Sequence, residues 1–169
     1  MMAGMAYDEL VEVLDERGKV IDVVPRAQMR AGNLRHRSVA VAVLHEGRVL
    51  AHQRADWKDV WPSRWDVAFG GVCDVGETWP AAALRELAEE AGITVGEHEL
   101  LDLGDDRFES DEVRLVGRLY ALDHAGPFTF ADGEVQAIEW VALTHLDEWL
   151  ATHDVVDDSR ALVVPRLLS

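Results

Sequence analysis

Three glutamates crowd the end of the segment RELAEEAG, Arg85–Gly92. Glu86, Glu89 and Glu90 stand at positions i, i+3 and i+4, so a helix would place all three on one side. The C-terminal end of a helix carries partial negative charge and neighbouring carboxylates repel each other, which together cost about 1–3 kcal/mol. A divalent cation would reverse this penalty, because Mg²⁺ and Mn²⁺ prefer carboxylate oxygens as ligands. The spacing therefore indicates a metal site.

The alternative interpretation is the solvated side of an amphipathic helix. Under either interpretation we predict that Leu84, Leu87, Ala88 and Ala91 form an apolar stripe on the side of the helix opposite the glutamates. Against this alternative, Arg85 is the only basic residue between Thr78 and Gly92, so we expect no cation of the helix to relieve the acids. We therefore favour carboxylates that serve a ligand.

The segment GGVCDVGE (70–77) precedes the helix and has the composition of a ligand-binding loop. Its three glycines let the backbone come close to a ligand and expose carbonyl groups. We predict an ion pair between Glu77 and Arg85 that holds this loop onto the helix; the alternative is an exposed pair of little energetic weight. The helix is expected to begin after the N-cap Thr78 and to stop at Gly92 in a left-handed conformation.

Apolar periodicity and turn residues predict the elements that position this segment. The first elements are a hairpin over 10–24 with its turn at 15–18, a short helix over 25–32, and strands over 38–44, 48–54 and 65–72, of which the last ends in two glycines. The helix over 78–91 follows. After it come strands over 113–122 and 134–143 and helices over 144–153 and from 157 onward. This order predicts an α/β or α+β sandwich with mixed strand pairing. The length suits a single domain over 1–169, in which 1–36 form an N-terminal hairpin and short helix.

The spacing of Gly71, Glu77 and the run Arg85–Ile93 resembles the signature box of the Nudix hydrolases at every defining position. That box spans 23 residues, 71–93. The resemblance implies a Nudix-type α/β/α sandwich around a mixed sheet, with the box as loop, helix and loop.

The resemblance also implies roles for individual residues. In Nudix enzymes the box glutamates hold Mg²⁺ or Mn²⁺, which implies Glu86, Glu89 and Glu90 as ligands, helped by the backbone carbonyl of Gly70. The metal would bridge to a diphosphate, offset its charge and lower the pKa of an attacking water. A base must take the proton of that water. Two candidates stay open: Glu86, and Glu134, which resembles the family's late acidic residue before a strand but is otherwise an ordinary loop carboxylate.

A narrower resemblance, carried by residues 35–66 and the N-terminal hairpin, is to Nudix proteins related to isopentenyl-diphosphate isomerase. That isomerase needs a cysteine and, two residues later, a metal-binding histidine. Here Gly70 and Val72 align with those two positions, and Cys73 comes three residues too late, although His36 matches another histidine ligand. Without the cysteine, the isomerase lacks its proton donor or acceptor. We therefore expect a hydrolase on an isomerase-like scaffold.

The net charge of −16 repels nucleic acid backbones and anionic membrane surfaces, so we expect neither as a partner. The charge is unevenly divided: residues 26–64 contain eight Lys or Arg and three acids, and residues 70–112 contain thirteen acids and two arginines. This division predicts an anion-holding wall that faces a cation-holding wall; the alternative is scattered surface charge. Phosphate contacts are expected from one or two of the basic residues Arg54, Lys58 and Arg64, and more weakly Arg35 and Arg37.

Three tryptophans, Trp57, Trp61 and Trp65, lie in the loop that follows the second long strand. They can stack on a base, but such residues more often anchor a loop or a core. The one cysteine, Cys73, forms no internal disulfide and is expected to be an inert thiol, which suits a reducing cytoplasm. We see no export signal at the N-terminus and no apolar run near the ~20 residues that cross a bilayer.

Together these features predict a Mg²⁺- or Mn²⁺-dependent hydrolase that cleaves the diphosphate of a nucleoside diphosphate linked to another moiety. A small-molecule diphosphate is the expected partner, and a homodimer stays open because homodimers are common among Nudix proteins. Two alternatives remain: an isopentenyl-diphosphate isomerase-like enzyme, and a catalytically silent Nudix domain that binds a nucleotide.

Overall fold

The computed structural model describes residues 9–130 and 133–169. Its strands are β1 (Leu10–Leu14), β2 (Val20–Pro25), β3 (His36–His45), β4 (Arg48–Arg54), β5 (Trp65–Asp66), β6 (Phe69–Val72), β7 (Leu101–Glu109), β8 (Arg114–Asp123) and β9 (Val135–Ala142). Its helices are α2 (Arg26–Ala31), α3 (Trp79–Ala91), α4 (Leu146–Thr152) and α5 (Val164–Leu168), with 3₁₀ turns η1 (Glu97–Glu99) and η2 (Leu143–His145) and a π-helical turn η3 (Ser159–Val163). The N-terminal stretch in which we expected no export signal begins with residues 1–8, which lie outside the described residues.

The large sheet is built around β3. Strand β8 runs parallel to β3 from the pair His36–Leu115 to the pair Leu44–Asp123, and β7 pairs antiparallel with β8. On the other side of β3, β6 pairs antiparallel with residues 38–41. Strand β4 pairs with β3 only at the C-terminal end of β3, through Leu44 and His45. Strand β4 also pairs with β5 and β9. The sheet is therefore mixed, and it divides beside β3 into a β6 branch and a β4 branch.

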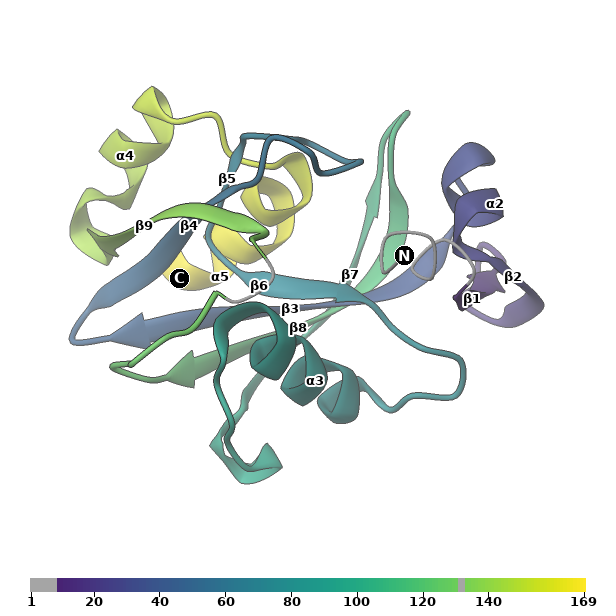
Figure 1. Ribbon diagram of the computed structural model, residues 1–169, viewed down its shortest axis with the longest axis horizontal. Coiled ribbons are helices and arrows are strands. Elements are labelled where there is room, and N and C mark those ends of the chain that lie inside the picture. The colour runs from purple at the N-terminus through teal and green to yellow at the C-terminus, as the bar shows by residue number, and fades with distance from the viewer. Residues whose placement is uncertain (1–8, 131–132) are drawn as a thin grey trace.

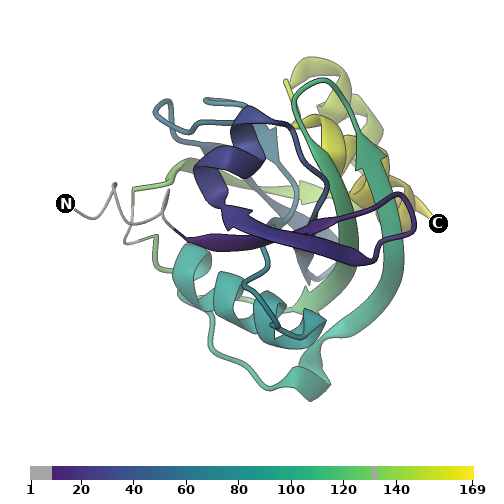
Figure 2. The ribbon, with the colours of Figure 1, turned by 90° about the vertical axis from the view of Figure 1, so that its right-hand side faces the viewer.

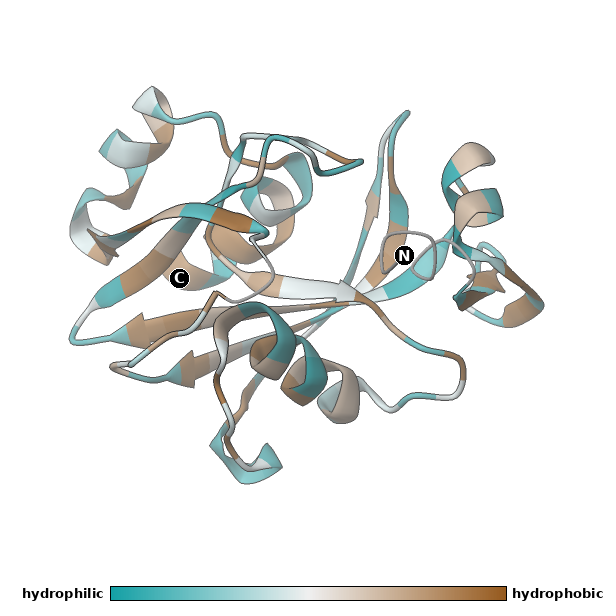
Figure 3. Ribbon diagram, in the orientation of Figure 1, coloured by the Kyte–Doolittle hydropathy of each residue, from teal (hydrophilic) through white to brown (hydrophobic). Residues whose placement is uncertain are grey.

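Helices cover both faces of this sheet (Figure 1). On one face α3 packs against β6 and β3, around the buried side chains of Val41, Phe69 and Leu87. On the other face α4, η3 and α5 enclose a second core that includes Leu146 and Val155. Figure 3 shows the hydrophobic stretches of β3 and β8 in the middle of the molecule, between these two layers. The predicted mixed α and β fold with helices around one large sheet is confirmed.

The N-terminal hairpin forms its own two-stranded sheet, with α2 beside it (Figure 2). Its small core contains Val11 and Met29 and reaches Val72 at the end of β6. Glu12 accepts a hydrogen bond from the backbone N–H of Gly76 at 2.7 Å. The hairpin therefore contacts the glycine-rich loop that precedes α3.

The strand predicted over 65–72 is in fact two strands. Asp66 ends β5, Val67 and Ala68 are buried between the strands, and β6 begins at Phe69. The prediction of one continuous strand was therefore wrong, because the chain breaks at Val67 and Ala68. The glycine-rich end was predicted correctly: Gly70 and Gly71 lie in β6 just before its last residue, Val72, and opposite Ala40 and Val39 of β3.

Strand β7 was not predicted. Its sequence, LDLGDDRFE, contains four acids and no regular alternation, because β7 lies at the edge of the sheet and is largely exposed. Its pairing with β8 is also interrupted by a bulge between Asp102 and Gly104.

Across the described ranges, no helix is both long and apolar enough to cross a membrane.

Candidate active site

Helix α3 begins and ends as its sequence predicts. The hydroxyl of Thr78 accepts a hydrogen bond from the backbone N–H of Ala81 at 3.3 Å, and Pro80 lies in the first turn. At the other end Gly92 adopts a left-handed φ of 66° and its N–H closes the last turn. The helix is therefore held at both ends, which fixes the direction of its acidic side chains.

We predicted that the acidic residues of α3 lie opposite its apolar stripe, and this prediction was wrong. The buried residues are Ala82, Ala83, Leu87 and Ala91, whereas Ala88 is exposed and Leu84 is half-buried. Glu86 and Glu90 follow Ala82 at intervals of four, so they form the row next to the stripe and are half-buried against β6. Only Glu89 is well exposed, with 57% of its side chain accessible.

Arg85 joins the loop to the helix. Its Nε and Nη2 donate to the two carboxylate oxygens of Glu77 at 2.8 and 2.9 Å, so the expected ion pair is present and bidentate. Nη2 also donates to the carbonyl of Val72 at 3.1 Å. Nη1 donates to Glu86 at 2.8 Å and to Glu89 at 3.3 Å. The prediction that no cation of the helix relieves the acids was therefore wrong, because Arg85 pairs with two of them, Glu86 and Glu89.

Glu86 and Glu90 are close enough to share a hydrogen bond between their carboxyl groups. Burial raises the pKa of Glu86, and burial together with the neighbouring charge of Glu86 raises the pKa of Glu90 well above its usual range. A backbone N–H, that of Gly70, donates to Glu90 Oε1 at 3.1 Å. The carboxyl groups of Glu86 and Glu90 are thus held side by side and largely away from solvent, which favours the binding of a proton or a cation between them.

The glycines of β6 make this approach possible. A Cβ on Gly71 would lie 2.7 Å from Oε1 of Glu86, so a side chain there would displace the carboxylate. A Cβ on Gly70 would lie 1.9 Å from the carbonyl oxygen of Val39 in β3. Position 70 therefore needs glycine for steric reasons, whereas a side chain at position 71 would be accommodated only by moving the Glu86 carboxylate away from β6.

Glu134 lies on the far side of the same site, just before β9. Its negative charge contributes to the raised pKa of Glu90. Its Oε1 lies 3.1 Å from Nζ of Lys58, which comes from the loop after β4. The structure thus brings Glu86, Glu90 and Glu134 to one region, and it leaves Glu89 at the rim beside Arg85.

The donor set fits a hard divalent cation only in part. Glu86 and Glu90 supply paired carboxylate oxygens, and a cation would take the place of the proton that their contact requires. However, in the described part of the chain no three His, Cys, Asp or Glu side chains stand together as a ready metal site. Glu89 would have to leave Arg85 to join the pair. The Gly70 carbonyl stays a predicted ligand.

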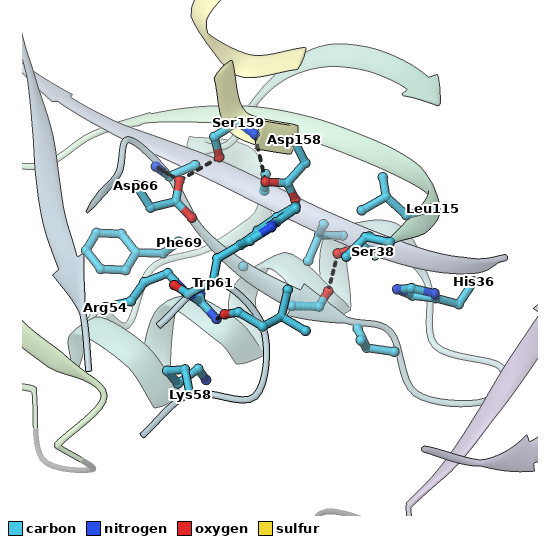
Figure 4. A pocket seen from close by; sticks show the side chains of 18 of the residues that line it. His36, Ser38, Arg54, Lys58, Trp61, Asp66, Phe69, Leu115, Asp158 and Ser159 are labelled. Carbon is cyan, nitrogen blue, oxygen red and sulfur yellow. Dashed lines mark hydrogen bonds between the residues drawn. The ribbon is translucent and has the colours of Figure 1, made fainter. Parts of the chain in front are cut away.

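A pocket of about 110 Å³ lies beside β6 and borders Gly70 and Gly71 (Figure 4). Its walls come from β3, β6, the loop after β4 and the segment that leads into η3. Its charged lining residues are the cations Arg26, Arg30, Arg54 and Lys58 and the acids Asp59, Asp66 and Asp158. These four cations belong to the basic segment 26–64. Half of the basic residues of that segment therefore gather at this pocket with three acids among them, and an anion-holding wall stays a prediction.

The pocket also contains a pair of acids, Asp66 and Asp158, that we did not predict. Asp66 accepts hydrogen bonds from the Ala68 N–H at 3.0 Å and from the hydroxyl of Ser159, whose own N–H donates to Asp158 at 2.8 Å. Burial, with the charge of Asp158 next, raises the pKa of Asp66 to about 7. Asp66 and Asp158 are far apart in the sequence, so only the fold brings them together.

The other predicted cations have protein partners. Arg64 donates to Asp154 at 3.0 Å and to Asp157 at 2.8 Å, and it does not line the pocket. Arg54 donates to the carbonyls of Val60 and Trp61, so it holds the loop while it lines the pocket. The weaker candidates Arg35 and Arg37 pair with Glu109 and Glu12.

Cys73 is poorly placed for chemistry. Its thiol is 3% exposed and belongs to the core beneath α3, and burial raises its pKa to about 12. His36, the first residue of β3, is buried, and this burial lowers its pKa to about 4. The burial and the raised pKa of Cys73 agree with the prediction of an inert thiol. They also leave the pocket without the cysteine that the isomerase alternative needs.

Arg85→Lys is expected to loosen the loop before α3. A lysine keeps the charge but loses the fork that reaches Glu77, Glu86 and the Val72 carbonyl together. We expect unfolding in urea to show a loss of about 1–3 kcal/mol. The matched control is Arg118→Lys on the exposed pair with Asp102, which should cost no more than about 1 kcal/mol. Equal losses in the two variants would contradict the role given to Arg85.

Asp66→Asn is expected to stabilise the protein above neutral pH. The amide keeps the oxygen that accepts from Ala68 and Ser159 and removes a buried charge. Since the folded pKa of about 7 exceeds the unfolded value of 3.8, the native state loses stability as pH rises through this range. The gain should be about 1–4 kcal/mol at pH 8 and should vanish near pH 4. Urea unfolding at both pH values measures it, with the exposed Asp157→Asn as control; a gain that does not depend on pH would refute the assignment.

The chain resembles known proteins in sequence. The NUDIX domain model matches residues 34–162. An uncharacterized Nudix hydrolase of Yersinia pestis is 36% identical over 141 residues, which cover 80% of this chain and 74% of that protein. An uncharacterized Nudix hydrolase of Rhodococcus erythropolis is 32% identical over 167 residues, which cover 92% of this chain and 90% of that protein.

Solved structures show the same fold. The crystal structure of DR0079 from Deinococcus radiodurans superposes with a TM-score of 0.76 at 23% identity and covers 95% of this chain and 100% of its own. The NUDIX domain of Shewanella oneidensis NrtR, complexed with ADP ribose, superposes with a TM-score of 0.60 at 16% identity and covers 76% of this chain and 83% of its own. With the sequence matches and the intact 71–93 box, the chain belongs to the Nudix hydrolase family.

Proposed function

We propose that this protein is a divalent-metal-dependent hydrolase that cleaves the diphosphate of a nucleoside diphosphate linked to a second moiety. The observation that carries the proposal is the half-buried pair Glu86 and Glu90, held against two glycines of β6 with Glu134 nearby. Nudix hydrolases generally need a divalent metal ion. One relative in fold, NrtR, was solved with ADP ribose, which is a compound of the proposed class.

The proposed ligands of Mg²⁺ or Mn²⁺ are Glu86 and Glu90, with Glu89 and the Gly70 carbonyl completing the set. When bound, the ion offsets the charge of the diphosphate and lowers the pKa of the attacking water. This need is strong in a chain of net charge −16, which otherwise repels a diphosphate. Lys58 and Arg54 line the adjoining pocket and supply positive charge beside it.

The proton of the attacking water goes to a carboxylate. Glu86 and Glu134 are the two candidates, and both lie by Glu90. Glu134 is paired with Lys58 at 3.1 Å, so as a base it would first exchange this partner for water. Glu86 is held by Arg85, which keeps its carboxylate directed toward β6. Kinetics of Glu86→Gln and Glu134→Gln distinguish them, because only loss of the base abolishes the acidic limb of the pH–rate profile.

The isomerase-like branch stays a weaker proposal. A Cβ at position 70 would meet the β3 backbone, and the one cysteine is buried away from the pocket. These features disfavour isomerisation of a prenyl diphosphate. A silent binding domain is also disfavoured, because it has no need of a strained carboxyl pair.

The test is a panel of diphosphate compounds incubated with Mg²⁺ or Mn²⁺, with products identified by mass. The panel includes ADP-ribose, nucleoside diphosphate sugars, dinucleoside polyphosphates and isopentenyl diphosphate. Metal-dependent release of phosphorylated products is expected. An isomerised prenyl diphosphate would favour the isomerase, and a metal-induced thermal shift without any product would favour the silent domain.

A further inference from the structure

The pocket beside β6 contains a hydrogen-bond donor with no partner. Trp61 is only 8% exposed, and across the described residues no group accepts a hydrogen bond from its Nε1. An indole N–H buried in this way normally finds an acceptor, since leaving it unpaired costs about 1–3 kcal/mol. Trp61 lines the pocket, so an acceptor on a bound molecule can satisfy it.

The backbone around this tryptophan is strained, and the strain is held in place. Trp61 has a φ of 50°, a left-handed conformation that a bulky residue rarely adopts. Arg54 donates to its carbonyl at 3.2 Å and to that of Val60 at 2.8 Å, and the indole packs edge-on against Phe108. Strain that the surroundings maintain is commonly found at binding sites. The loop thus fixes the direction of the indole.

Carboxylates face the same space. Oδ1 of Asp66 and Oδ1 of Asp158 are both occupied through Ser159, and within residues 9–130 and 133–169 no hydrogen bond reaches the second oxygen of either. Figure 4 shows the indole of Trp61 in the pocket together with Asp158 and Asp66. Among the donors and acids that line the pocket, the unpartnered indole N–H of Trp61 therefore lies together with two carboxyl groups that can each accept a further hydrogen bond.

We propose that this pocket binds an amino-substituted heteroaromatic ring, such as adenine or cytosine, at the nucleoside end of the substrate. The ring nitrogen or carbonyl accepts from Trp61 Nε1, and the exocyclic amino group donates to Asp158 and Asp66. This inference rests on the proposed function, and it adds the part of the substrate that the protein distinguishes.

The position of the pocket agrees with such a ligand. At about 110 Å³ the pocket is smaller than the ~150 Å³ cavity that encloses a benzene ring, but it is open to solvent, so a ring would enter in part and leave its sugar outside. Because the pocket borders Gly70 and Gly71, the sugar would lead toward Glu86 and Glu90. A prenyl chain is a poor occupant, because it offers no partner to the indole N–H or to the second oxygen of either carboxyl group and would exclude water from them.

The test uses neutral nucleosides without any metal, so that it does not depend on hydrolysis. The protein is labelled with ¹⁵N, and the indole N–H signals are followed by NMR while adenosine, cytidine or uridine is added in EDTA. The Trp61 signal is assigned by its loss in Trp61→Phe. The matched control is Trp57→Phe, because Trp57 lies in the same loop but is 60% exposed. We expect adenosine or cytidine to move the Trp61 signal downfield.

Uridine should bind at least tenfold more weakly, because its carbonyls would face the carboxylates. Asp158→Asn, followed at the Trp61 signal, and Trp61→Phe, followed by equilibrium dialysis of the nucleoside, should weaken the binding of adenosine or cytidine at least tenfold. Asp157→Asn and Trp57→Phe, measured by both methods, should not. Three outcomes would each overturn the proposal. Uridine could bind as tightly as adenosine and cytidine, the Trp61 signal could respond to no nucleoside, or Asp158→Asn could leave the affinity unchanged. If nucleosides bind but the diphosphate panel yields no product, the proposed function fails alone; if the panel is hydrolysed without nucleoside binding, the pocket assignment fails alone.

Discussion

Glu90→Gln is expected to lower metal-dependent hydrolysis by about 10²–10³-fold while it stabilises the metal-free protein. The glutamine oxygen can still accept from the Gly70 N–H, so the local fold is retained. What is lost is the second negative charge beside Glu86, which the proposed cation requires. The same loss relieves the repulsion between two half-buried carboxyls. Activity and stability should therefore move in opposite directions, which a variant that merely damages the fold would not show.

The measurement compares kcat/KM at saturating Mg²⁺ with the thermal midpoint in EDTA. Glu148→Gln, an exposed acid on α4, is the matched control and should change neither. Glu89→Gln tests the outermost predicted ligand: a fall smaller than that of Glu90→Gln is expected, since Glu89 lies at the rim with Arg85. Unchanged hydrolysis in Glu90→Gln would refute the proposed metal site.

The sequence predicted what local pattern determines. The caps of α3, the pair Glu77–Arg85 and the buried strand β3 all depend on residues close in the chain or on apolar runs. The exposed edge strand β7 escaped, because its residues face water and it is stabilised by backbone pairing with β8. Periodicity detects buried faces, and β7 has little of one.

The candidate site was predictable only in part, for the same reason. The spacing of Glu86 and Glu90 put both on one side of a helix, but it could not show that this side turns toward β6. That direction depends on the small residues Gly70 and Gly71, which β3 holds in place. Asp66 and Asp158 meet only through tertiary packing around Ser159. No pattern within one segment contains such information.

Gly70→Ala is expected to destabilise the protein by more than about 3 kcal/mol, beyond the usual cost of overpacking. The added Cβ would lie 1.9 Å from the carbonyl oxygen and 2.8 Å from the carbonyl carbon of Val39, and 3.0 Å from Cα of Ala40. All three are backbone atoms of the central strand, so no side-chain rotation relieves the overlap. β6 must move away from β3, and Glu90 then loses the N–H that holds it.

Gly117→Ala is the matched control, because Gly117 also lies within a strand of the same sheet. There the nearest atom to an added Cβ is Cδ1 of Leu115 at 3.3 Å, the end of a flexible side chain. Urea unfolding should show a loss below about 1.5 kcal/mol for this variant. If Gly70→Ala were as stable as Gly117→Ala, the close contact of β6 with β3 would be wrong. A cysteine at position 70 needs the same Cβ, so the steric limit that fixes the glutamate site also disfavours isomerase chemistry in this chain.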